Sequence, residues 1–289
     1  MTRVSTIRRD RNGGAVSESS HQWVKGCAFG CGGLVVLFVL AIVGMSFSMR
    51  RAFVDAHVDR VTLEQQFGDY DAFTPAVDGS VMDIRVSAFL EVRQALAGVH
   101  GRIEDVDREM GEFEELTDDG EPELRVALPA VFRLTKTMMG LPWVFGEVER
   151  VRNQALVEAG MGIGEYTYIF VLAYHDELVA PTDQSNLFSA SATNSRVRND
   201  LREMIRRQLA EARTELPEDD DWLGVLEEET VLLDADPDRI PWQDGLPEQI
   251  ADCFRSSRET LDAAYSAAAA EFELHNSTIR GGGMSIQMD

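Results

Sequence analysis

The longest apolar stretch of the chain runs from Gly26 to Met49 and contains no charged side chain. A transmembrane helix needs about 20 apolar residues to cross about 30 Å of hydrocarbon. The pattern therefore predicts one transmembrane helix over residues 25–50, after a short basic polar tail at residues 1–24. Two arginines follow the apolar run directly, which is unusual for a cleavage site, so we expect an uncleaved anchor.

Small residues in this segment recur at a spacing that lets a second helix approach closely. We expect them to pack against a membrane-protein partner, and self-association through the same helix is an alternative. They are Gly26, Cys27, Gly30, Cys31, Gly33 and Gly44.

Basic side chains flank both ends of the predicted anchor, with a small excess before it. The positive-inside rule then favours a cytoplasmic N-terminus. We therefore expect a single-pass membrane protein in the lipid bilayer, with an extracytoplasmic C-terminal domain that is periplasmic if the cell is Gram-negative.

After a predicted juxtamembrane helix and linker at residues 51–80, hydrophobic residues step regularly by three and four. The series is Phe89, Val92, Leu96, Val99, Ile103, Val106, Met110 and Phe113. Such a heptad seam predicts one long helix that packs along another helix. It lies in a predicted helical lobe at residues 81–180.

The same lobe contains two further apolar segments, at residues 142–158 and 164–177, which we interpret as a helical hairpin with Gly160 capping the first arm. The second segment reads GEYTYIFVLAYHDE and is apolar all round, as is typical of a central helix. It is too short to cross a bilayer, because only nine residues separate Glu165 from His175.

A linker at residues 181–195 precedes a second predicted helical lobe at residues 196–280, and a flexible tail follows at residues 281–289. The second lobe begins with a helix that contains six arginines. We expect these to pair with surrounding acids; a dock for an acidic partner or for lipid headgroups is the alternative. Apolar residues at helical spacing from Ile250 to Phe272 predict one final helix.

No segment alternates between apolar and polar residues as a strand would. The sequence therefore predicts an all-α protein: a single N-terminal transmembrane helix followed by a bundle-like soluble domain of about 7–8 helices.

Composition narrows the choice of function. At 44 % hydrophobic and 27 % charged residues, the chain can bury a core. Residues 1–51 carry seven basic and two acidic side chains, so the remainder accounts for −28 where the whole chain has −23. Such an acidic body disfavours a nucleic-acid partner. It also contains a single cysteine, so no disulfide can form within it.

Three acidic or basic side chains near the central helix are candidates for acid–base catalysis, namely Glu165, His175 and Asp176. No second histidine stands at a metal-binding spacing from His175. We expect instead that Glu165 is buried and caps the preceding turn or bonds to a tyrosine.

A second candidate site is the run Asp234, Asp236 and Asp238, which resembles the start of a calcium loop. Arg239 then occupies the position that needs glycine, and Gly245 the position that needs the bidentate glutamate. An acidic turn is the simpler interpretation. Nucleophile-elbow, phosphate-loop and dinucleotide motifs are absent from the sequence, and we expect no cofactor.

Together these patterns favour a non-enzymatic accessory, assembly or scaffold subunit, whose acidic helical domain docks on a membrane-protein partner or complex. A membrane-tethered hydrolase that uses Glu165, His175 and Asp176 is one alternative. A ligand-sensing helical domain is the other.

Overall fold

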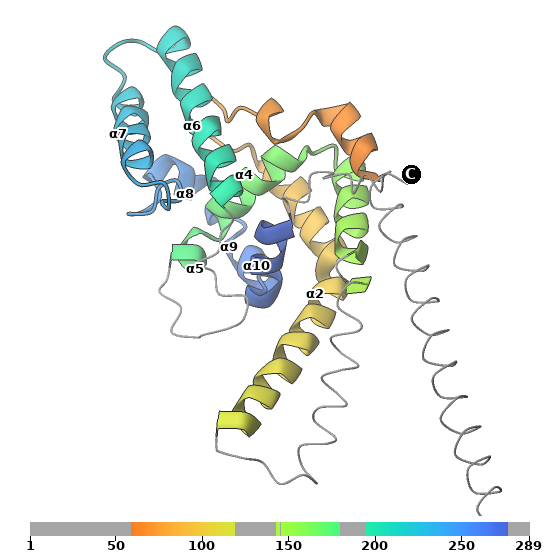
Figure 1. Cartoon of the computed structure of the whole chain (residues 1–289). Helices are drawn as coiled ribbons and strands as arrows, with labels where there is room; N and C mark the ends of the chain where they lie inside the picture. Colours follow the sequence, from red (N-terminus) through yellow and green to blue (C-terminus); the bar gives the residue numbers. More distant parts are fainter. Residues whose placement is uncertain (1–58, 119–142, 145, 180–194, 277–289) are drawn as a thin grey trace, which may run out of the picture. The chain divides into compact units, whose positions relative to one another are not determined.

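The computed structural model describes residues 59–118, 143–144, 146–179 and 195–276 (Figure 1). The chain divides into two compact units, Met1–Arg50 and Arg51–Asp289. The predicted transmembrane helix with its small residues and the basic tail before it lie outside the described residues. So do the C-terminal tail and nearly all of the predicted linker. The described residues contain helices and no strand, which confirms the all-α prediction for them.

Within the described residues, no helix taken singly has the length and apolar character needed to cross a membrane. The helix Gly146–Glu158 and α4 (Ile163–Ala173) meet that criterion only as a pair, and the pair is bent by 100°.

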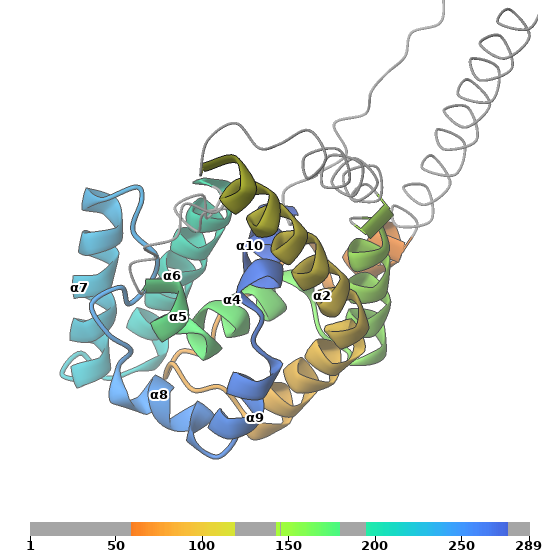
Figure 2. The same cartoon turned by 90° about the horizontal axis from the view of Figure 1, so that it is seen from below.

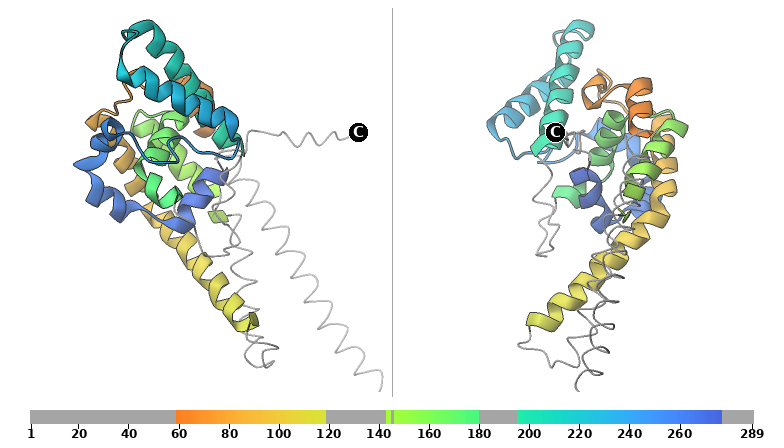
Figure 3. Two further views of the ribbon diagram at one scale, coloured as in Figure 1. Left: turned by 90° about the vertical axis from the view of Figure 1, so that its left-hand side faces the viewer. Right: turned by 45° about the vertical axis from the view of Figure 1, so that its right-hand side comes forward.

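The heptad seam forms one long helix, α2 (Asp83–Asp118), as predicted. Its first five apolar positions, from Phe89 to Ile103, are buried, and Val106 and Met110 are partly buried. α2 packs against α4, α9 (Arg258–Ala264) and α10 (Ala267–Asn276) (Figure 2). The second half of α2 extends beyond the other helices that the structure describes (Figure 3). The prediction of a long helix packed along others is therefore confirmed.

The central helix follows a glycine cap. At Gly160 the backbone has φ +61°, its N–H donates to the Val157 carbonyl at 3.2 Å, and the Met161 N–H donates to the Leu156 carbonyl at 2.9 Å. This is a Schellman motif, and glycine takes the left-handed position at no steric cost. α4 begins three residues later and buries every residue except Glu165. The central position predicted for this segment is confirmed.

Two details of that prediction are wrong. The 100° bend between the helix Gly146–Glu158 and α4 makes a corner, not a hairpin with antiparallel arms. In addition, the predicted second arm is two helices, because α4 ends at Ala173 and the short α5 (His175–Val179) starts after Tyr174. At Gly164 a Cβ would stand 2.7 Å from the Tyr70 carbonyl, so only glycine allows η1 (Tyr70–Ala72) to approach α4 this closely.

α6 (Ser195–Glu215) and α7 (Asp221–Ala235) are packed side by side (Figure 1). Asp220 caps α7 by accepting a hydrogen bond from the Trp222 N–H at 2.9 Å. The predicted final helix is three helices: α8 (Glu248–Arg255), α9 and α10. The described residues therefore hold more helices than expected, and α2 packs directly on α9 and α10, so the two predicted lobes share one core.

Candidate functional site

Glu165 is a structural anchor. Both of its carboxylate oxygens accept hydrogen bonds from Arg85 of α2 at 2.5 Å, and Arg85 also donates to the Gly160 carbonyl at 3.1 Å. The pair thus fastens α2 to the glycine cap in front of α4. The expectation that Glu165 bonds to a tyrosine or caps the preceding turn by itself is wrong, since its partner is an arginine from a helix 80 positions earlier.

His175 and Asp176 also have structural contacts. His175 Nε2 lies 2.7 Å from the Trp242 carbonyl oxygen, and its Nδ1 lies 3.4 Å from Asp176 Oδ1. Asp176 is exposed and stands 3.6 Å from Arg258. Ten positions separate Glu165 from His175, which is about 15 Å along a helix. The structure therefore does not bring the three predicted catalytic residues together.

The three aspartates of the predicted calcium loop face arginines of α6. We call Arg198, Arg202, Arg206 and Arg213 the arginine row. Arg206 pairs with Asp234 at 2.5 Å and Arg198 with Asp238 at 2.8 Å, while Arg202 donates to the Asp236 carbonyl at 3.3 Å. Arg213 reaches Glu227 of α7 at 2.8 Å. These contacts support the ion-pairing interpretation of the arginine-rich helix. No group of side chains suited to a metal ion occurs among the described residues.

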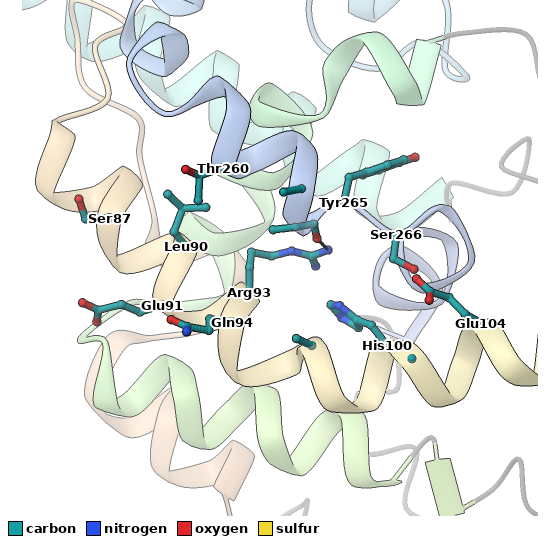
Figure 4. Close-up of a pocket in the computed structure, with 14 residues that line it drawn as sticks. Ser87, Leu90, Glu91, Arg93, Gln94, His100, Glu104, Thr260, Tyr265 and Ser266 are labelled. Carbon is teal, nitrogen blue, oxygen red and sulfur yellow. Dashed lines mark hydrogen bonds between the residues drawn. The ribbon is translucent and has the colours of Figure 1, made fainter.

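The site that the structure does assemble is a groove between α2 and the α9–α10 turn, with a volume of about 620 Å³ (Figure 4). We call it the α2 groove. One wall is a single stripe of α2, and the other is formed by α9 and the residues after it. The stripe includes Ser87, Glu91, Gln94, Ala97, Gly101 and Glu104, and the opposite wall includes Thr260, Ala263, Ala264 and Tyr265.

The floor of the groove is a buried cluster of four polar side chains from three helices: Arg93, His100, Tyr166 and Glu273. We call it the floor cluster. Glu273 of α10 accepts hydrogen bonds from Arg93 and from the Tyr166 hydroxyl, and His100 Nε2 lies 2.8 Å from Glu273 Oε1. Arg93 also donates to the Ala264 carbonyl at 2.9 Å, and its guanidinium lies 5.1 Å from the centre of the Phe170 ring. The cluster therefore ties α2, α4 and α10 together.

The charges of the floor cluster are fixed by one another. Burial alone would raise the pKa of Glu273, but Arg93 and His100 outweigh burial and lower it to about 2. Burial, together with the neighbouring Glu273 charge, raises the pKa of Tyr166 well above its ordinary value. The pKa of Arg93 is also raised, because attraction to Glu273 exceeds the cost of burial.

This electrostatic arrangement does not suit acid–base chemistry. A general acid or base works best with a pKa near the operating pH. Glu273 stays ionised, while Tyr166 and Arg93 stay protonated, across the physiological range. The floor cluster is consequently a rigid, internally neutralised base for the groove.

The rim of the groove has the opposite property. Glu91 and Glu104 are exposed at its edge. The cations among its described lining residues are Arg93 and His100, and both face Glu273. The uncompensated charge of the groove is therefore negative, on walls with short side chains at Ala97 and Gly101.

Sequence reasoning missed the floor cluster. The heptad seam places Arg93 directly after the buried Val92, at the flank of the apolar stripe, where a long charged side chain normally reaches solvent. Glu273 lies in the predicted last helix, 180 positions away. An arginine beside a seam and a glutamate in an alanine-rich helix are the available signals, and neither identifies the other as its partner.

Fold and site together define an all-α protein with an acidic-rimmed groove above a closed ion cluster. Comparisons of the chain with protein-family models, with curated proteins and with solved structures found no match. The functional argument therefore rests on the residues themselves.

Proposed function

We propose that this chain is a non-enzymatic, single-pass membrane-anchored accessory subunit that docks on a partner membrane protein through the α2 groove. The predicted helix at residues 25–50 would hold it in the bilayer. The observation that carries the proposal is a groove of about 620 Å³ whose floor is closed and whose rim is open and charged. Such a surface offers shape and charge to a partner, and it offers no poised acid, base or nucleophile.

Small residues in the wall support docking of a macromolecule. A Cβ built on Gly101 meets nothing within 4 Å, so this part of the wall is open to an incoming chain. Short side chains on both walls allow a partner backbone to come close, as they do where helices pack.

Filling the groove tests the proposal. The full chain is purified from its native membrane in mild detergent, and the mass of the complex is measured. We expect the wild type and Gly224→Trp to co-purify with a membrane-protein partner, and Gly101→Trp to elute as the 32.1 kDa chain alone. Gly224 is the matched control, because it lies on the exposed side of α7 and its Cβ also meets nothing within 4 Å.

Two results would overturn this proposal. The first is a wild-type protein that is recovered only as a free monomer. The second is a complex that survives Gly101→Trp as well as it survives the control, because the groove would then not be the docking site.

The proposed orientation places residues 51–289 outside the cytoplasm. Protease added to intact cells, or to spheroplasts of a Gram-negative host, should then degrade this domain, while a cytoplasmic marker protein stays intact. Degradation only after the membrane is ruptured would place the domain on the cytoplasmic side and refute the orientation.

A further inference from the structure

We propose that the occupant of the α2 groove is a basic α-helix of the partner protein. This inference rests on the proposed docking function and adds the chemistry and conformation of the docked segment. Three features of the groove carry it: its length along α2, the helical nature of its walls, and the sign of the charge on its rim.

The groove follows one face of α2 over almost five turns. Its lining residues on that helix run from Ser87 to Glu104, which corresponds to about 25 Å at 1.5 Å per residue. Within this stretch Ser87, Gln94 and Gly101 recur every seven residues, so the stripe runs nearly parallel to the helix axis. A straight segment of about 17 residues in helical form would fill the same length.

The walls favour a helix over an extended peptide. An extended peptide gains affinity mainly by pairing its backbone with the edge of a sheet. The walls of the groove are helices, and the structure contains no strand within the described residues. Backbone N–H and C=O groups in these walls already bond within their own helices. A docked helix satisfies its own backbone, whereas an extended segment would leave buried polar groups unpaired.

The rim favours basic side chains. Glu91 and Glu104 are exposed on α2, and the two cations among the described lining residues face inward to Glu273. The whole body outside residues 1–51 carries a net charge of −28. An acidic segment would therefore meet repulsion at short and at long range, while a segment with lysine or arginine would be attracted in both.

Site-specific cross-linking tests the conformation of the occupant. A diazirine-bearing amino acid replaces Ser87, Gln94 or Gly101, one at a time, in the full chain in native membranes. The cross-linked partner residues are then identified by mass spectrometry. Successive sites are about 10.5 Å apart, so a docked helix should react at residues about seven positions apart. An extended segment should react about three positions apart. The same amino acid at the exposed Val231 of α7 is the control and should not give this product.

Charge reversal tests the chemistry. The double variant Glu91→Lys, Glu104→Lys should lower the yield of the Gln94 cross-link at least about tenfold, because two attractions become repulsions. The control double variant Glu218→Lys, Glu228→Lys changes the net charge equally at exposed positions that do not line the groove, and it should leave the yield within about twofold.

The outcomes separate this inference from the proposed function. Cross-links to a membrane protein with a three-residue step, or a yield that ignores charge reversal in the groove, would refute a basic helix and leave docking intact. Absence of any groove-specific product from all three positions would refute docking itself. A seven-residue step combined with loss on charge reversal would support both.

Discussion

Two sets of arginines fasten distant parts of this chain, and they work in opposite settings. In the floor cluster, the side chains of Arg93 and Glu273 are 0 % and 2 % exposed. In the arginine row, Arg206 and Arg213 are 42 % and 58 % exposed while they pair with Asp234 and Glu227. When a surface pair is broken, water solvates both charges. When a buried pair is broken, the remaining charge has no such replacement.

The comparison teaches that the number of ion pairs is a poor guide to what they stabilise. The arginine row makes more pairs than the floor cluster, yet exposed pairs contribute about 0–1 kcal/mol each. One buried carboxylate, Glu273, should therefore matter more than any member of the row. It also holds α10 against α2 beneath the groove, so its loss should affect the site as well as the fold.

The largest effect is expected from breaking the floor cluster on one side. Glu273→Gln keeps the shape of the side chain and removes its charge, which leaves Arg93 buried without a counter-ion. We expect the free energy of unfolding to fall by about 3–5 kcal/mol. Chemical denaturation of the full chain in detergent, followed by circular dichroism, measures this change.

A double-mutant cycle isolates the pair from its surroundings. Arg93→Met combined with Glu273→Gln removes both charges, so the double variant should be clearly more stable than the sum of the two single effects predicts. Additive single effects, or a Glu273→Gln cost below about 1 kcal/mol, would mean that the buried pair behaves like a surface pair.

A smaller effect is expected from pH. The folded-state pKa of Glu273 is about 2, below the ordinary value of 4.5. A depressed folded-state pKa contributes stability that is fully present above pH 4.5 and is lost as the pH falls from 4.5 towards 2. That contribution corresponds to about 3 kcal/mol.

The other carboxylates of the chain titrate in the same range, so the informative quantity is the difference between wild type and Glu273→Gln. Measured by denaturation between pH 6 and pH 2.5, the two stability curves should converge as the pH falls. Curves that stay parallel would show that Glu273 has an ordinary pKa and is not held by Arg93 and His100.

The difference between the two regions also explains what the sequence could predict. Regular spacing of apolar residues predicted α2, and the concentration of arginines predicted that α6 pairs with nearby acids, because both are patterns within short stretches. The position of α4 followed from its uniformly apolar face. Each of these predictions needs only neighbours in the chain.

The floor cluster needs three helices to meet, and no local pattern contains that information. The last helices show the same limit. Apolar spacing from Ile250 to Phe272 is continuous, yet the chain breaks at Ser256 and again at Tyr265 to carry α9 and α10 around α2. Periodicity shows which face is buried, while the packing partner decides where a helix must stop. Glu165 was similarly misjudged, because its partner Arg85 lies 80 residues away.

The smallest effect is expected in the arginine row. Arg206→Gln removes the pairs with Glu203 and Asp234, all of which have side chains at least 42 % exposed. We expect a loss of no more than about 0.5 kcal/mol at low salt, and less in 1 M NaCl, where screening acts over about 3 Å. The same denaturation assay measures it beside Glu273→Gln, whose cost should hardly change with salt because water and ions do not reach the floor cluster. A salt-independent loss of several kcal/mol for Arg206→Gln would remove the distinction between the two regions, and would show that the row holds α7 and its following loop as firmly as the floor cluster holds α10.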